Sequence, residues 1–162
     1  MQLLRENVLH DINADKQFAY ECHIRDFFAK NITQFRPGEL VSSKEVIYAK
    51  SNIRADLRTV NCRDVIFEWE FKIEADYSAI GQVLSYTAQA KTEFGFKRTV
   101  RPVIAAFKFP DEIKLAIEVN NLGIETVELP LWLRAAGSTP NVVNEAPKIF
   151  LPTLNKHTFK GY

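Results

Sequence analysis

The feature that most constrains the fold of this chain is a short run of strictly alternating side chains. Within residues 65–74 (VIFEWEFKIE), four large apolar side chains alternate with four charged ones: Phe67, Trp69, Phe71 and Ile73 against Glu68, Glu70, Lys72 and Glu74. A period of two places successive side chains on opposite faces of a β-strand. The run therefore predicts a strand with one face toward a core and the other face charged.

A second strand is predicted just before it, over residues 53–60 (IRADLRTV). The short polar segment 61–64 between the two strands favours a hairpin. Alternation in this second strand places Asp56 with Arg54 and Arg58 on one face. The hairpin would then bring Asp56 beside Glu70 and Lys72, so that two carboxylates and an ammonium meet on one face.

The remaining segments predict an α/β protein. Helices are expected over residues 14–30, 78–94 and 111–121, and further strands over 45–49, 101–109 and 124–133, with a loop at 31–43 around Pro37 and Gly38. This order indicates a three-layer sandwich with a mixed central β-sheet. We expect one domain over residues 1–134, followed by an irregular C-terminal arm or tail over 135–162.

Composition narrows the class of protein. With 162 residues, 46% hydrophobic and 25% charged, the chain has a soluble globular profile. It holds no apolar run of the ~20 residues that span a bilayer and no secretory signal, and Cys22 and Cys62 are isolated. We therefore expect a cytoplasmic protein with free thiols and no membrane partner. The three histidines are too scattered for a zinc site. The sequence has no glycine-rich phosphate-binding loop, so we expect no nucleotide cofactor.

Two acids and a lysine on adjacent strands suit a hard divalent cation. Mg²⁺ takes one or two carboxylates and keeps several waters, and it can activate water and stabilise a leaving oxygen in phosphodiester hydrolysis. An alternative explains the same residues without chemistry, because a charged strand face is usually a solvated surface with cross-strand salt bridges.

The arrangement resembles the PD-(D/E)XK nuclease superfamily. Its motif, an acid on the second strand followed by D/E-x-K on the third, matches Asp56 and Glu70-Phe71-Lys72, with Ala55 in place of the proline. Gln82-x-x-x-Tyr86 resembles the Q-x-x-x-Y motif of one branch. The resemblance implies a restriction-endonuclease-like αβββαβ core over roughly the first two-thirds of the chain.

The resemblance also implies roles for individual residues. Asp56, Glu70 and the backbone carbonyl of Phe71 would hold Mg²⁺ or Mn²⁺, Lys72 would be the catalytic lysine, and Gln82 and Tyr86 would help to position the DNA strand. Glu21, on the first helix, fits a further glutamate that the family often supplies. Glu6 and Glu45 are lesser candidates for that position.

The remaining charges have expected partners too. Glu68 lies one strand step before the motif and is expected to pair with an arginine, which would be Arg54, Arg58 or Arg63. Contacts with DNA are expected from a set of basic residues: Arg54, Arg58, Lys97, Arg98 and Arg101. The basic and aromatic segment 156–162 (KHTFKGY) could also contact nucleic acid or form a frayed tail.

The sequence thus predicts a Mg²⁺-dependent DNA endonuclease, with restriction or defence, mobile-element or homing, and junction processing as open roles. Because cutting both strands of a duplex usually needs two active sites, we expect a homodimer or a higher assembly. The alternatives are a non-catalytic nucleic-acid-binding or structural module on the same fold, and an α/β domain with a charged face of salt bridges.

Overall fold

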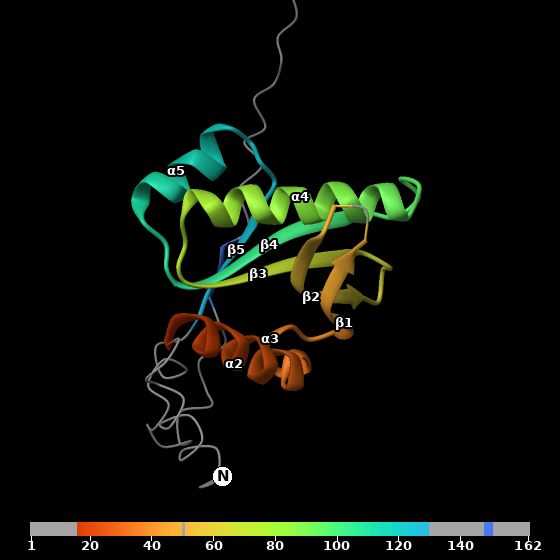
Figure 1. Ribbon diagram of the computed structural model, residues 1–162, viewed down its shortest axis with the longest axis horizontal. Helices are drawn as coiled ribbons and strands as arrows, with labels where there is room; N and C mark the ends of the chain where they lie inside the picture. Colours follow the sequence, from red (N-terminus) through yellow and green to blue (C-terminus); the bar gives the residue numbers. More distant parts are fainter. Residues whose placement is uncertain (1–15, 50, 130–147, 151–162) are drawn as a thin grey trace, which may run out of the picture.

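The fold is built on one mixed sheet, shown in Figure 1, a computed structural model that describes residues 16–49, 51–129 and 148–150. The helices in this part are α2 (Lys16–Lys30), α3 (Ile32–Phe35), α4 (Tyr77–Glu93) and α5 (Asp111–Val119). The strands are β1 (Glu39–Tyr48), β2 (Ile53–Asn61), β3 (Ile66–Glu74), β4 (Val100–Lys108), β5 (Glu125–Glu128) and β6 (Lys148–Phe150). The strands lie in sequence order across the sheet.

The sheet is mixed because its connections differ. The pairs β1–β2, β2–β3 and β5–β6 are antiparallel, whereas β3–β4 and β4–β5 are parallel. Parallel neighbours need a crossover, and α4 and α5 supply the two that this sheet requires. The side chain of Asp76 begins α4 by accepting a hydrogen bond from the N–H of Ala79 at 2.7 Å.

Helices cover both faces of the sheet, with α4 and α5 on one side and α2 and α3 on the other (Figure 1). The apolar row of β3 packs under α2 and α3, where Phe28 contacts Trp69 and Phe71 with ring centroids 5.2 and 5.5 Å apart. The charged row of β3 therefore faces α4. The three-layer α/β sandwich with a mixed sheet is confirmed.

Two expected irregular segments are partly regular. The expected loop at 31–43 contains α3 and the first residues of β1. Strand β1 has 10 residues and is therefore twice as long as the strand expected over 45–49. The error has a physical cause, since β1 is an edge strand with only its first and last residues buried and so lacks hydrophobic alternation. The expected irregular arm at 135–162 contributes β6, where Ile149 pairs with Val127 of β5.

Among the described residues, no helix has the length and apolar character needed to cross a bilayer. The expected boundary at residue 134 and the segment 156–162 lie outside the described residues, and so does Glu6.

Candidate active site

The hairpin of β2 and β3 stops pairing at the motif acids. Its ladder runs from Val60 opposite Ile66 to Leu57 opposite Trp69 and ends just before Asp56 and Glu70. Past that point the backbone N–H of Phe71 donates to Oδ2 of Asp56 at 2.9 Å. The carboxylate takes the place of a backbone acceptor, which fixes Asp56 between the two strands.

Glu70 is held by two neighbours. Nζ of Lys72 lies 2.8 Å from its Oε1, and the hydroxyl of Tyr86 on α4 donates to its Oε2 at 2.8 Å. The Glu70 residue is 3% exposed, whereas the Lys72 side chain is 20% exposed. The lysine therefore connects a buried carboxylate to the protein surface.

The pKa values of Asp56 and Glu70 are both raised above their ordinary values. Burial, followed by the charge of Asp56, raises the pKa of Glu70 to about 7 against the opposing effects of Lys72 and Tyr86. Burial also raises the pKa of Asp56, although the Phe71 N–H and nearby cations oppose the shift. Two carboxylates that repel each other in a partly dry site favour the binding of a cation between them.

Lys72 is stabilised in its charged form. Burial lowers its pKa, but the hydrogen bond and the charge of Glu70, with the charges of Glu21 and Asp56, outweigh that effect and raise the pKa overall. At neutral pH the side chain is therefore an ammonium that can offset negative charge on a substrate.

Glu21 of α2 joins the same cluster. Burial raises its pKa, while the charge of Lys72 lowers it and the charge of Asp56 raises it. Its Oε1 is buried and has no hydrogen-bond partner in the described part of the chain. An unpaired buried carboxylate oxygen close enough to feel the charge of Asp56 is a group that a cation or a water would satisfy.

The donor set fits a hydrated Mg²⁺ or Mn²⁺ rather than a fully enclosed metal. Within residues 21–49 and 51–129, no three His, Cys, Asp or Glu side chains converge closely enough for a complete protein cage. Asp56, Glu70 and the carbonyl of Phe71 offer oxygen ligands, with Glu21 nearby. Mg²⁺ usually takes only one or two carboxylates and retains water in its other positions.

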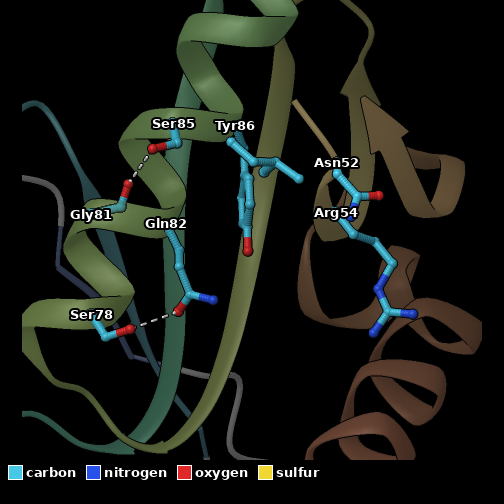
Figure 2. Close-up of a pocket in the computed structure, with 8 residues that line it drawn as sticks. Asn52, Arg54, Ser78, Gly81, Gln82, Ser85 and Tyr86 are labelled. Atoms are coloured by element: carbon cyan, nitrogen blue, oxygen red, sulfur yellow. Dashed lines mark hydrogen bonds between the residues drawn. The ribbon is translucent and has the colours of Figure 1, made fainter. Parts of the chain in front are cut away.

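A groove of about 510 Å³ adjoins this cluster, between α4 and the turn that joins β1 to β2. Figure 2 shows Gln82 and Tyr86 on α4, with Asn52 and Arg54 across the groove on the opposite wall. Gly81 also lines the groove, and a Cβ there would meet open space. Gln82 and Tyr86 thus share one wall, as their spacing on a helix predicts.

The expected basic residues fall into different surroundings. Arg54 lines the groove and lies 3.5 Å from Glu45, which also pairs with Arg25 of α2 at 2.9 Å. Glu45 is therefore an ion-pair partner of two arginines. Lys97 and Arg101 are exposed, and Arg98 pairs with Asp64.

Arg58 is placed in the protein interior, contrary to the expectation that it contacts DNA. Its guanidinium bonds to Glu68 at 2.6 Å, to the hydroxyl of Tyr48 at 2.9 Å and to Glu93 at 3.1 Å. Both Arg58 and Glu68 are buried. The expected pairing of Glu68 with an arginine is confirmed, and Arg58 is that arginine.

Sequence reasoning missed Arg25 and Asn52. The positive charge of Arg25 lowers the pKa of Asp56 more strongly than the charge of Lys72 does. Asn52 lines the groove. A signal for Arg25 was present, because it follows Glu21 by four residues and so shares its face of the helix. Asn52 carried no such signal, since its role depends on the shape of the turn.

Comparison with solved structures shows which known fold this chain shares. No family model and no curated protein matches this sequence. Solved structures that resemble it include a repair endonuclease from Pyrococcus abyssi, with 21% identity, a TM-score of 0.55, and 72% of this chain and 47% of that chain covered. The chain has the restriction-endonuclease-like α/β fold.

Two structures of EndoMS share the same fold. The complex of EndoMS with double-stranded DNA has 22% identity and a TM-score of 0.53, covering 65% of this chain and 43% of that one. The apo form has 22% identity and a TM-score of 0.53, covering 68% and 47%. This chain therefore spans less than half the length of the structures it resembles.

Proposed function

We propose that this chain is a metal-dependent DNA endonuclease domain of the PD-(D/E)XK superfamily. The observation that carries the proposal is the convergence of Asp56, Glu70 and Lys72 where the β2–β3 ladder ends, beside an open groove. The fold it shares with a repair endonuclease and with DNA-bound EndoMS supports DNA as the substrate.

Each acid has a distinct position in the proposed site. Asp56 is fixed by the Phe71 N–H through Oδ2, which leaves Oδ1 as a ligand. Glu70 is fixed by Tyr86 through Oε2 and by Lys72 through Oε1, so that its carboxylate is not free to rotate. A bound Mg²⁺ or Mn²⁺ would supply Lewis-acid activation of water and neutralise charge on the phosphate.

Lys72 is the group that meets the reacting phosphate. Its ammonium is charged, is partly exposed and lies on the same strand face as Glu70. It can donate a hydrogen bond to the attacking water or to a phosphate oxygen, and it offsets the negative charge that develops in the transition state. Its present bond to Glu70 holds it at that position before substrate arrives.

The groove supports a role in holding the cut strand. The Gln82 amide on one wall can donate and accept hydrogen bonds, and the other wall includes the cationic Arg54. Arginine binds phosphate through two parallel N–H groups. For cleavage of both strands of a duplex, a second copy of the chain would bring a second site.

A plasmid assay tests this function. Purified chain should nick supercoiled plasmid in Mg²⁺ or Mn²⁺ and lose this activity in EDTA, in Asp56→Ala and in Lys72→Ala. Glu74→Gln is the matched control, because Glu74 lies on the same strand and is bonded only to Lys108 within the described residues. We expect this variant to cut as the wild type does.

Metal binding is checked separately by thermal unfolding. Because a ligand that binds only the folded state stabilises it, Mg²⁺ should raise the melting temperature of the wild type and of Glu74→Gln but not of Asp56→Ala. Plasmid cleavage that persists in both active-site variants contradicts the proposal. Binding of DNA without any cleavage would favour the non-catalytic module instead.

A further inference from the structure

The loop that follows α4 carries an exposed aromatic side chain in an unfavourable backbone conformation. Phe96 is 76% exposed, and its φ is +59°. A bulky residue at positive φ is uncommon, because its Cβ crowds the backbone there. Glycine or asparagine would adopt this turn at lower cost, and an exposed side chain contributes little packing in return.

The loop is nevertheless held firmly. The N–H of Phe96 donates to the carbonyl of Lys91 at 2.9 Å, and the N–H of Lys97 donates to that of Phe94 at 3.1 Å. The ring of Phe94 contacts two guanidinium groups, those of Arg58 and Arg98, which lie 5.2 and 4.9 Å from its centroid. The ring of Phe96 is therefore presented outward from a rigid base.

The charge around the loop is positive. Residues 91–98 hold three cations, Lys91, Lys97 and Arg98, and one acid, Glu93, which pairs with Arg58. Lys91, Lys97 and Arg63 have no salt-bridge partner in the part of the chain that the structure describes. At the other end of α4, residues 74–78 and 108–112 hold four acids and one cation: Glu74, Asp76, Asp111 and Glu112 with Lys108. The excess of cations at the loop favours contact with a polyanion.

We propose that the loop of residues 94–98 is a DNA-contacting element in which Phe96 stacks on an unpaired base while Lys97 contacts the adjoining phosphates. Exposed aromatic rings combined with cations are the elements by which proteins bind single-stranded nucleic acid. The proposal rests on the proposed function and deepens it, because it assigns a substrate with an unpaired segment beside the cut.

The position of the loop sets the length of that segment. From Gln82 in the groove to Phe94, α4 extends ~18 Å at ~1.5 Å per residue. A nucleotide stacked as in a duplex advances ~3.4 Å, so a base on Phe96 would lie about five stacked nucleotides from the groove, or fewer where the unpaired strand is extended.

The test is DNA binding by the full chain, measured by fluorescence anisotropy in EDTA so that no cleavage occurs. The two probes are a labelled DNA hairpin with a long single-stranded tail and the same hairpin with a blunt end. We expect Phe96→Ala to weaken binding of the tailed hairpin about tenfold, the loss of one stacked base. The blunt hairpin should bind both proteins equally, and Phe96→Trp should restore tail binding.

Two variants separate stacking from folding. Phe96→Gly should weaken tail binding as Phe96→Ala does, while raising the melting temperature, because glycine adopts positive φ without strain. Leu115→Ala removes a side chain that is 60% exposed on α5 and should change neither quantity. Unchanged tail binding in Phe96→Ala or Phe96→Gly overturns the inference, and so does wild-type protein that binds neither probe.

The two proposals can fail separately. If the wild type cuts plasmid and Phe96→Ala binds the tail normally, the inference falls and the nuclease proposal stands. If Phe96 is needed for tail binding and no metal supports cleavage, the loop contact stands and the nuclease proposal falls.

Discussion

Strand β3 carries two buried glutamates two positions apart, and only one of them belongs to the candidate active site. Glu68 and Glu70 point to the same face, both toward α4, and burial raises the pKa of each to about 7. Each has a cationic partner, at 2.6 Å for Arg58 with Glu68 and 2.8 Å for Lys72 with Glu70. Neither burial nor pKa tells them apart.

What separates them is access and the balance of charge. Arg58 and Glu68 are both buried, and the Arg58 guanidinium also bonds to Glu93 and lies over the Phe94 ring, so this pair has little access to solvent. Glu70 has a second acid beside it, Asp56, and its lysine reaches the surface next to a groove. A closed pair contributes to the fold, whereas an open site with excess negative charge can take a cation and a substrate.

The largest expected effect is on cleavage by Asp56→Asn. The amide still accepts from the Phe71 N–H, so the strand geometry is kept, but the negative charge is lost. We expect cleavage to fall by about 10³-fold, the upper range for loss of one electrostatic contact in a transition state. Without metal, the unfolding free energy should stay the same or rise, since the repulsion between Asp56 and Glu70 is removed. Plasmid nicking and denaturant unfolding measure the two quantities.

The closed pair should show the opposite behaviour. Arg58→Met leaves Glu68 buried without its cation, and breaking a buried pair from one side costs about 3–5 kcal/mol of unfolding free energy. The matched control is Arg54→Met, whose side chain is 44% exposed and lies 3.5 Å from Glu45. It should cost less than about 1 kcal/mol. Equal costs in chemical denaturation would contradict the distinction between the two regions.

A smaller effect is expected from Tyr86→Phe. This variant deletes one 2.8 Å hydrogen bond to Glu70 and keeps the ring in the core. A hydrogen bond to a charged group contributes about 1.5–3 kcal/mol, so cleavage should slow by about 10–100-fold. Thr87→Val on the same helix removes a hydroxyl that, among the described residues, bonds only to the Val83 carbonyl, and it should leave cleavage unchanged. Normal cleavage by Tyr86→Phe would show that Glu70 needs no anchor.

The smallest expected effect is on the pH dependence of stability. The pKa of Glu68 is about 7 in the folded state and near the ordinary 4.5 when unfolded, so the folded protein binds the extra proton between these values. Its contribution to stability is full below pH 4.5 and is lost as pH rises through about 7, with a slope of at most ~1.4 kcal/mol per pH unit. In Glu68→Gln, the unfolding free energy should therefore fall less steeply as the pH rises over this range. An unchanged slope contradicts the assignment.

The sequence predicted the strand hairpin and its acids because alternation in β3 is unusually regular. The layered α/β fold, the pairing of Glu68 with an arginine and the shared helix face of Gln82 and Tyr86 also followed from spacing alone. Spacing could not show that Arg58 turns inward, because that depends on Glu93 and Tyr48, which approach from α4 and β1. Edge strand β1 has no hydrophobic alternation, and the groove beside Asn52 has no pattern in the sequence. Both depend on tertiary packing.

The most direct test of the central claim compares Glu70→Gln with Glu68→Gln in one experiment. Both variants replace a buried glutamate on the same face of β3 by its neutral amide. For each, the rate of plasmid nicking in Mg²⁺ or Mn²⁺ is divided by the folded fraction measured by denaturant unfolding. We expect Glu70→Gln to stay folded and lose cleavage, whereas Glu68→Gln should be less stable and cut normally per folded molecule. Normal cleavage by folded Glu70→Gln would contradict the central claim.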